Sequence, residues 1–188
     1  MQIEKLEIPD VVLIKPMRFK DQRGWFQENW KKSAWDQQFD GINFHQENTS
    51  MSLSAGTLRG LHLQTPPAAQ AKLLEVLSGE IFDVAIDLRT DSETYGKWVG
   101  QILSEENGYS MFIPVGFAHG FLTLQDKTRV RYKCSAEYMP EAEVGLRFDD
   151  PEIAIEWPKS AGDFILSEKD LAGKTLADFT SPFRCDNT

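Results

Sequence analysis

Short segments in which apolar and polar residues alternate run through most of the chain. In residues 79–89, GEIFDVAIDLR, the apolar side chains Phe82, Val84, Ile86 and Leu88 share one face and Asp83 and Asp87 share the other. Residues 127–138, KTRVRYKCSAEY, place Val130, Tyr132 and Cys134 opposite Arg129, Arg131 and Lys133. A period of two residues is typical of β-strands, so both segments are predicted strands.

Further strands are predicted at VVLIKPMRF (11–19), AKLLEVLSG (71–79), KWVGQILS (97–104) and GYSMFIPV (108–115), which Gly, Pro, Asn, Asp and Ser residues separate. Short helices are predicted at KKSAWDQQFD (31–40) and LSEKDLAG (166–173). The strands do not alternate with helices, and no repeat or low-complexity linker interrupts them. We therefore expect a single domain over residues 1–188, with an antiparallel barrel or sandwich and a few short helices.

Composition and charge narrow the classes of function. The 188 residues are 41% hydrophobic and 26% charged, a globular balance, and the formal net charge is −9. A negative field repels polyanions, so no nucleic-acid partner is expected. A small anionic ligand held by a local basic cluster remains compatible with this charge.

Cysteine usage and hydropathy favour a reducing compartment. Cys134 and Cys185 lie far apart and form neither a disulfide framework nor a zinc-binding spacing. The N-terminal residues lack the apolar core of a signal peptide, and no apolar run approaches the ~18 residues needed to span a bilayer. We expect a cytoplasmic protein without a membrane partner.

Two segments carry the chemistry-bearing motifs. Residues 56–62, GTLRGLH, and residues 108–124, GYSMFIPVGFAHGFLTL, resemble the two motifs of the cupin barrel, a double-stranded β-helix related to the jelly roll. Metal-binding cupins carry His-x-His, a Glu and a later His. This chain has His62 and His119, but Gln64 takes the place of the second His, and Ala68 and Ala69 occupy the Glu region. Because first-row divalent metals need three or four donors, no metal site is expected.

Nearly the whole chain resembles the dTDP-4-dehydrorhamnose 3,5-epimerase family of metal-independent cupins. The stretches that carry the resemblance are DQRGWFQENW (21–30), HQENTSMS (45–52), residues 58–89, YGKWVG (95–100), FIPVGFAHGF (112–121), RYKCSAEY (131–138), GLRFDDPEIAIEWP (145–158) and LSEKD (166–170). The resemblance implies a dTDP-sugar substrate, no cofactor, and a homodimer in which N-terminal strands complete the partner's sheet. One departure is Leu63, where the family commonly has an aromatic residue.

Epimerisation beside a ketone needs a base, a group that stabilises the enolate, and an acid on the opposite face of the sugar. A histidine is suited to the role of base because its unperturbed pKa lies near neutral pH. The resemblance implies that His62 is the base, oriented by Asp170, with Lys72 near the enolate oxygen and Tyr132 as the proton donor. Since 108 positions separate His62 from Asp170 (170 − 62), their contact cannot be read from the sequence.

The same resemblance implies the substrate contacts. These are Arg23, Glu28, Gln46, Asn48, Arg59, His119, Tyr138, Glu143 and Lys169. Arginine fits a diphosphate because its planar fork donates paired hydrogen bonds. A regular strand would put Arg59 and His62 on opposite faces, and a bulge or twist that Gly60 permits would bring both to one site.

Several of these residues also have structural explanations. His119 fits a structural hydrogen bond as well as a ligand contact, and Tyr132 fits core packing. Arg129, Arg131 and Lys133 fit a solvated or interface surface. Three alternative functions stay open: an epimerase acting at C3 or C5 only, a 3,4-ketoisomerase, and a sugar-nucleotide-binding cupin without catalysis.

Overall fold

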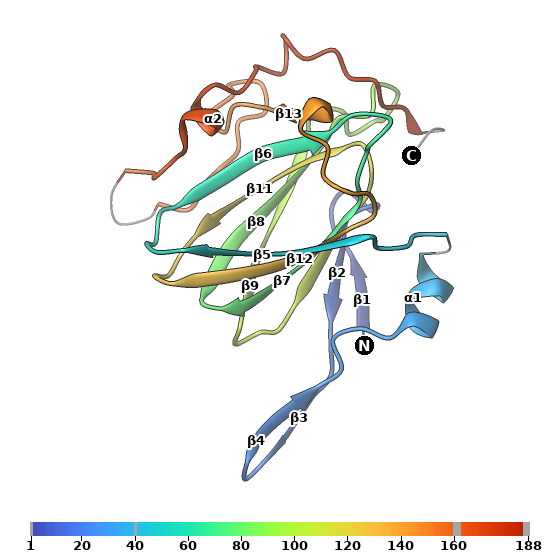
Figure 1. Ribbon diagram of the computed structural model, residues 1–188, viewed down its shortest axis with the longest axis vertical. Helices are drawn as coiled ribbons and strands as arrows, with labels where there is room; N and C mark the ends of the chain where they lie inside the picture. Colours follow the sequence, from blue (N-terminus) through green and yellow to red (C-terminus); the bar gives the residue numbers. More distant parts are fainter. Residues whose placement is uncertain (1, 40, 160–162, 186–188) are drawn as a thin grey trace.

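Two antiparallel sheets face each other and form a barrel, which Figure 1 shows in this computed structural model. The structure describes residues 2–39, 41–159 and 163–185. The six-stranded sheet has the order β1 (Gln2–Lys5), β2 (Val12–Lys15), β10 (Ser110–Ile113), β7 (Lys72–Ser78), β12 (Thr128–Cys134) and β5 (Gln46–Ser52). The five-stranded sheet has the order β13 (Glu143–Gly145), β6 (Leu58–Gln64), β11 (Phe117–Thr123), β8 (Glu80–Asp87) and β9 (Trp98–Ser104).

The remaining elements are a hairpin and short helices. They are β3 (Arg18–Asp21), β4 (Gly24–Gln27), α1 (Lys32–Gln38), the 3-10 turn η1 (Pro140–Ala142) and α2 (Glu168–Leu171). Every predicted strand and both predicted helices have counterparts here, but residues 11–19, predicted as one strand, contain β2 and the start of β3, which belong to different sheets. The predicted β-rich cupin barrel is therefore confirmed. No helix in the described part of the chain is long and apolar enough to cross a membrane.

The barrel interior is an apolar core with polar groups at one side. Leu74, Val76 and Val130 from the six-stranded sheet pack there against Ile81 and Ala85 of β8. Alternate residues of a strand share a face, so Asp83, which lies between Ile81 and Ala85, also points inward, and it is wholly buried. The acidic face of β8 is thus the inner one.

The apolar face of β8, which carries Phe82, Val84 and Ile86, points away from the barrel interior. Val84 and Ile86 lie under an outer layer from the C-terminal segment, in which Leu176, Phe179 and Phe183 are buried. This segment runs over the top of the barrel in Figure 1. Burial on both faces explains why β8 is apolar apart from its two aspartates and Glu80.

A bulge in β6 brings Arg59 and His62 to the same pocket, as predicted. His62 pairs with His119 and Arg59 pairs with Phe121, so two residues of β6 oppose one residue of β11. Gly60, inside the bulge, has a φ of +109°, and a Cβ there would lie 2.6 Å from the carbonyl oxygen of His119. Only glycine fits this close approach of two backbones.

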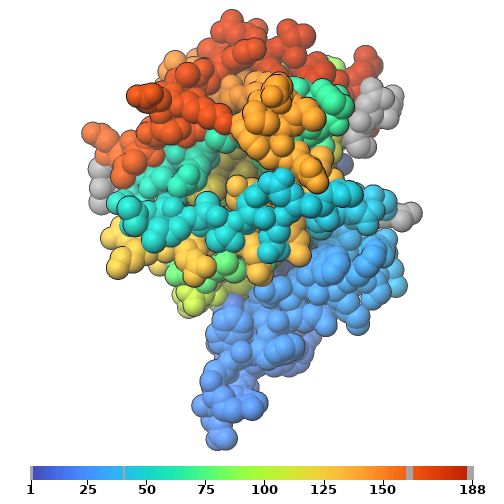
Figure 2. All heavy atoms as spheres, viewed as in Figure 1, coloured from blue at the N-terminus to red at the C-terminus, as the bar shows by residue number. Residues whose placement is uncertain are grey.

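The β3–β4 hairpin, residues 18–27, projects away from the barrel; we call it the arm. Figures 1 and 2 show it as a narrow extension of the molecule. Phe19, Trp25 and Phe26 on the arm are 57%, 53% and 69% exposed. Large aromatic side chains clustered in this way on a projecting hairpin are typical of a surface that another protein chain covers.

Candidate active site

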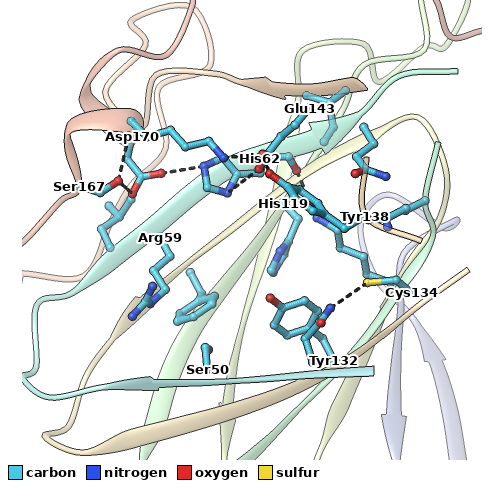
Figure 3. A pocket seen from close by; sticks show the side chains of 18 of the residues that line it. Ser50, Arg59, His62, His119, Tyr132, Cys134, Tyr138, Glu143, Ser167 and Asp170 are labelled. Atoms are coloured by element: carbon cyan, nitrogen blue, oxygen red, sulfur yellow. Dashed lines mark hydrogen bonds and ion pairs between the residues drawn. The ribbon is translucent and has the colours of Figure 1, made fainter. Parts of the chain in front are cut away.

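A cavity of about 690 Å³ opens into the barrel between the two sheets (Figure 3). All predicted site residues except Arg23 and Glu28 line it. From the strands these are Gln46, Asn48, Arg59, His62, Lys72, His119, Tyr132 and Glu143, and from the segments outside the sheets Tyr138, Lys169 and Asp170. Side chains from six strands and α2 therefore converge on one space.

His62 and Asp170 lie in contact despite their separation in the sequence. Nε2 of His62 is 2.7 Å from Oδ1 of Asp170, an ion-pair distance, although the buried Nε2 has no well-aligned hydrogen-bond partner. Ser167, the N-cap of α2, donates its hydroxyl to Oδ2 of Asp170 at 2.6 Å, and the Gly60 amide donates to Oδ1 at 3.3 Å. Burial alone would raise the pKa of Asp170, but the contacts with His62 and Ser167 hold it at about 2. Asp170 is therefore ionised at neutral pH.

Glu143 lies on the other side of the His62 ring. Its Oε1 is 3.9 Å from Nδ1 of His62. Its Oε2 accepts hydrogen bonds from the Tyr138 hydroxyl, at 2.5 Å, and from the Lys169 ammonium. Burial opposes ionisation of Glu143, but the hydrogen bonds from Lys169 and Tyr138 keep its pKa below the ordinary value. His62 thus lies between two ionised carboxylates.

Lys72 and His119 line the pocket beside His62. The Lys72 ammonium lies 3.5 Å from the backbone carbonyl oxygen of His62. Burial lowers the pKa of Lys72, while the thiol of Cys134 and the carboxylates of Glu143 and Asp83 partly offset this effect. Nε2 of His119 lies 2.7 Å from Oδ1 of Asp83, and burial lowers the pKa of His119 against the opposing effect of Asp83. His119 therefore has a structural partner and also faces the cavity.

Tyr132 faces His62 from the opposite sheet. It stands on β12, whereas His62 stands on β6, and Figure 3 shows the two rings on different sides of the cavity. Burial raises the pKa of Tyr132, so its phenol is protonated at neutral pH. Beside it, Asn48 donates to Sγ of Cys134 at 3.8 Å, and burial raises the pKa of that thiol.

The predicted arginines lie in different places. Arg59 lines the cavity and donates to the Ser52 hydroxyl at 3.1 Å and to the Met51 carbonyl at 3.3 Å. Arg23 lies near the tip of the arm, where its side chain is 85% exposed and pairs with Asp21 at 2.6 Å. Glu28 follows the arm and is exposed as well. The pocket of the same chain does not include these two residues, so their role in binding stays a prediction.

The family profile described as dTDP-4-dehydrorhamnose 3,5-epimerase matches residues 5–178. A curated relative with this name, from Sinorhizobium fredii, is 44% identical over 98% of this chain and 94% of its own. The chain belongs to the dTDP-4-dehydrorhamnose 3,5-epimerase family. It is an isomerase, as predicted.

Solved structures of dTDP-sugar epimerases share the fold closely. The dTDP-6-deoxy-D-glucose-3,5-epimerase of Legionella pneumophila, in complex with dTDP-4-keto-L-rhamnose, superposes with a TM-score of 0.90 at 41% identity, over 95% of this chain and 94% of that one. ChmJ, a 3'-monoepimerase of Streptomyces bikiniensis in complex with dTDP-quinovose, superposes with a TM-score of 0.85 at 31% identity, over 92% and 87%. Proteins with one and with two named epimerisation positions therefore share this barrel.

Sequence reasoning did not assign Asp83 or Ser167 to the site of this epimerase. Asp83 lies within hydrogen-bond distance of His119, and Ser167 donates a hydrogen bond to Asp170. Ser167 had a recognisable signal, because Ser-x-x-Asp at a helix start is typical of an N-terminal cap. Asp83 had a weaker one, an acid in the middle of an otherwise apolar strand.

Gln64 has a structural role in this epimerase. Its amide nitrogen donates to the carbonyl oxygens of Ala68, at 2.7 Å, and Glu137, at 3.2 Å, and its oxygen accepts from the Met139 amide at 2.7 Å. The position that holds a metal-binding histidine in other cupins is thus occupied by an amide bonded to backbone. Across the described ranges, no group of three or more His, Cys, Asp or Glu residues is arranged to hold a metal ion.

Proposed function

We propose that the enzyme inverts C3 and C5 of dTDP-4-dehydro-6-deoxy-D-glucose, giving dTDP-4-dehydro-L-rhamnose, without a metal or redox cofactor. The observation that carries this proposal is the placement of His62 and Tyr132 on opposite sheets across one cavity. Inversion requires that a proton leave from one face of a carbon and return to the other. The related Legionella enzyme, named for this double epimerisation, supports the choice of substrate.

His62 is the base in this proposal. Asp170 occupies the Nε2 side of the ring at 2.7 Å, so Nδ1 is the nitrogen left to receive the substrate proton. The carboxylate of Asp170 stabilises the imidazolium that forms. Lys72, deep in the cavity beside His62, stabilises the negative charge that develops on the C4 oxygen as the enolate forms.

Tyr132 is the acid in this proposal. Its phenol faces the cavity from β12 and is protonated at neutral pH because burial raises its pKa. It returns a proton to the enolate from the side opposite His62. Rotation of the sugar ring in the pocket, or two successive exchanges in one pose, then allows both carbons to be inverted.

In this proposal Arg59 and Lys169, which both line the cavity, supply positive charge for the diphosphate of the nucleotide. Gln46, Asn48, His119, Tyr138 and Glu143 also line this cavity. These groups offer the donors and the aromatic ring that a nucleotide needs. Their assignment as substrate contacts is part of the proposal.

Arg23 and Glu28 complete the nucleotide site of a second copy in this proposal. Arg23 belongs to the arm, which projects away from the barrel (Figure 1), Glu28 directly follows it, and neither residue lines the pocket of its own chain. Its exposed aromatic residues need a covering surface, and β5, beside the pocket, is an edge strand of the six-stranded sheet. A homodimer in which each arm lies against the partner covers the aromatic residues and protects that edge.

An epimerase that acts on one carbon is the second candidate, and the likeness to the monoepimerase ChmJ favours keeping it. Incubation with the 4-keto substrate in D2O, followed by NMR, separates the candidates. Deuterium and inversion at both C3 and C5 support the proposal. Deuterium and inversion at one carbon identify a monoepimerase, and binding of dTDP without exchange identifies a binding protein.

A further inference from the structure

One side chain at the base of the arm ties both of its strands to the barrel. Arg18, the first residue of β3, donates Nε to the amide oxygen of Gln27 on β4 at 2.8 Å. Its Nη1 and Nη2 donate to the carbonyl oxygens of Glu106, at 2.6 Å, and Glu105, at 2.9 Å, in the turn before β10. The guanidinium also stacks on Trp25, 3.9 Å from the ring centroid.

The hydrogen bonds continue from the arm onto the six-stranded sheet. The Gln27 amide donates to Oδ1 of Asn29 at 2.8 Å and to the Gly108 carbonyl at 3.2 Å. Asn29 donates to Oε2 of Glu75 on β7 at 3.0 Å, and Oε1 of Glu75 accepts from Arg131 on β12. The strands of the arm pair only with each other among the described strands, so these contacts at its base hold it in place.

We propose that Arg18 is a positioning residue for substrate binding, because it fixes the direction in which the arm presents Arg23 to the nucleotide diphosphate in a second copy. This inference rests on the proposed homodimer. Arg18 and Arg23 are five residues apart, which is at most ~17 Å at the rise of about 3.3 Å per residue of an extended strand. A rotation of roughly 10° at the base therefore moves the tip by ~3 Å, enough to break a hydrogen bond.

The alternation along the segment after the arm supports the same conclusion. Gln27 and Asn29 turn toward their own barrel, where they make the bonds described above. Glu28, between them, is exposed and lies on the opposite side of the extended backbone. The network that Arg18 begins therefore orients Glu28 outward as well as Arg23.

Lysine cannot replace Arg18 in this role. Three nitrogens of one planar guanidinium bond three acceptors here, and its face covers an indole ring. A lysine ammonium has the charge but not the planar fork, and it cannot reach the same acceptors together. Lys20, on the same strand, provides the contrast: it is exposed, and its side chain makes no hydrogen bond to the described residues.

A double-mutant cycle on dTDP affinity, measured by calorimetry at concentrations where sedimentation shows one oligomeric state, tests this inference. Arg23→Ala is expected to weaken dTDP about ten- to a hundredfold, since a charge-assisted hydrogen bond is lost. Arg18→Ala is expected to weaken dTDP about three- to tenfold, because the arm loses its pre-organisation. In the Arg23→Ala background, Arg18→Ala is expected to have no further effect.

Arg18→Lys and Lys20→Ala are the matched variants. Arg18→Lys keeps the charge and is expected to weaken dTDP nearly as much as Arg18→Ala, while Lys20→Ala leaves the affinity unchanged. Losses that add in the double mutant, or an equal loss in Lys20→Ala, would overturn the positioning role. If Arg23→Ala weakens dTDP and Arg18→Ala does not, this inference alone fails; wild-type affinity in Arg23→Ala removes the arm from the proposed function as well.

Discussion

Among single residues, Asp170 matters most for the proposed role of His62 as a base, because its ionised carboxylate lies in contact with the imidazole ring. The pKa of Asp170 is held at about 2, below its ordinary value of 3.8, because His62, Ser167 and the Gly60 amide stabilise the charge against the effect of burial. A carboxylate with a depressed folded-state pKa stabilises the fold above its unfolded pKa. That stability is lost as the pH falls through the folded value.

We expect Asp170→Asn to lose stability at neutral pH and to be less sensitive to acid than the wild type. The shift from 3.8 to about 2 corresponds to roughly 2 kcal/mol of unfolding free energy, present at pH 5 and lost toward pH 2. Urea unfolding of both proteins at several pH values measures the difference. A difference that stays constant from pH 5 to pH 2 would show that the ionisation of Asp170 does not stabilise the fold.

The amide of Gln64 leads to a prediction about metals. Because this amide bonds three backbone groups in place of a metal ligand, turnover is expected to survive treatment with EDTA and dialysis. Elemental analysis of the purified protein should find no stoichiometric transition metal. Activity that EDTA abolishes and one added metal restores would contradict metal-free chemistry.

Through the resemblance, sequence reasoning reached half of the residues that line the pocket, including the pair His62 and Asp170, but it did not reach Asp83 and Ser167. Asp83 and Ser167 are short polar residues whose function depends on what lies beside them in space. Alternation along a strand shows which residues share a face, but it does not show which face is inside. For β8 the face with Asp83 proved to be inside, because a C-terminal layer covers the other face.

At the scale of elements, the bulge in β6 is what lets one strand supply both ends of the site. In the sequence, only the presence of Gly60 in the segment from Arg59 to His62 indicated a possible bulge, and the register of β6 with β11 confirms it. The sequence could not show the reason, which is the close backbone of His119 and Gly120 on the neighbouring strand.

Gly60→Ala is expected to destabilise the fold by about 3 kcal/mol or more, because the added Cβ meets backbone at 2.6 Å and the φ of +109° disfavours alanine. Gly145→Ala is the matched control in the adjacent strand β13, where the nearest atoms to an added Cβ are 3.9 Å away. Urea unfolding compares the two. Equal stability of both variants would show that the bulge tolerates a side chain.

For the whole molecule, the proposed homodimer requires that the arm of one chain complete the site of its partner. We expect the wild type to sediment as a dimer and the double variant Phe19→Ser, Phe26→Ser to dissociate more readily, since these paired side chains are exposed in a single chain. Ile102→Ser, an exposed apolar residue on β9, is the control. A wild type that sediments as a monomer at all concentrations would contradict the dimer. The resemblance implies that Arg23 and Glu28 contact the substrate, but a single sequence does not show which chain's pocket they would reach, because that depends on the assembly.

In the proposed mechanism, His62 removes the proton from one sheet and Tyr132 returns it from the opposite sheet. Tyr132→Phe keeps the ring and removes only the phenolic proton, so the fold should be unaffected. The decisive measurement is the ratio of deuterium exchange to inversion at C3 and C5 in D2O, read by NMR for Tyr132→Phe and wild type. We predict a higher ratio in Tyr132→Phe, because His62 still exchanges the proton on one face while inversion slows by about 10²-fold or more. An unchanged ratio with full turnover would contradict the claim, and the acid would then have to be Tyr138 or a water molecule.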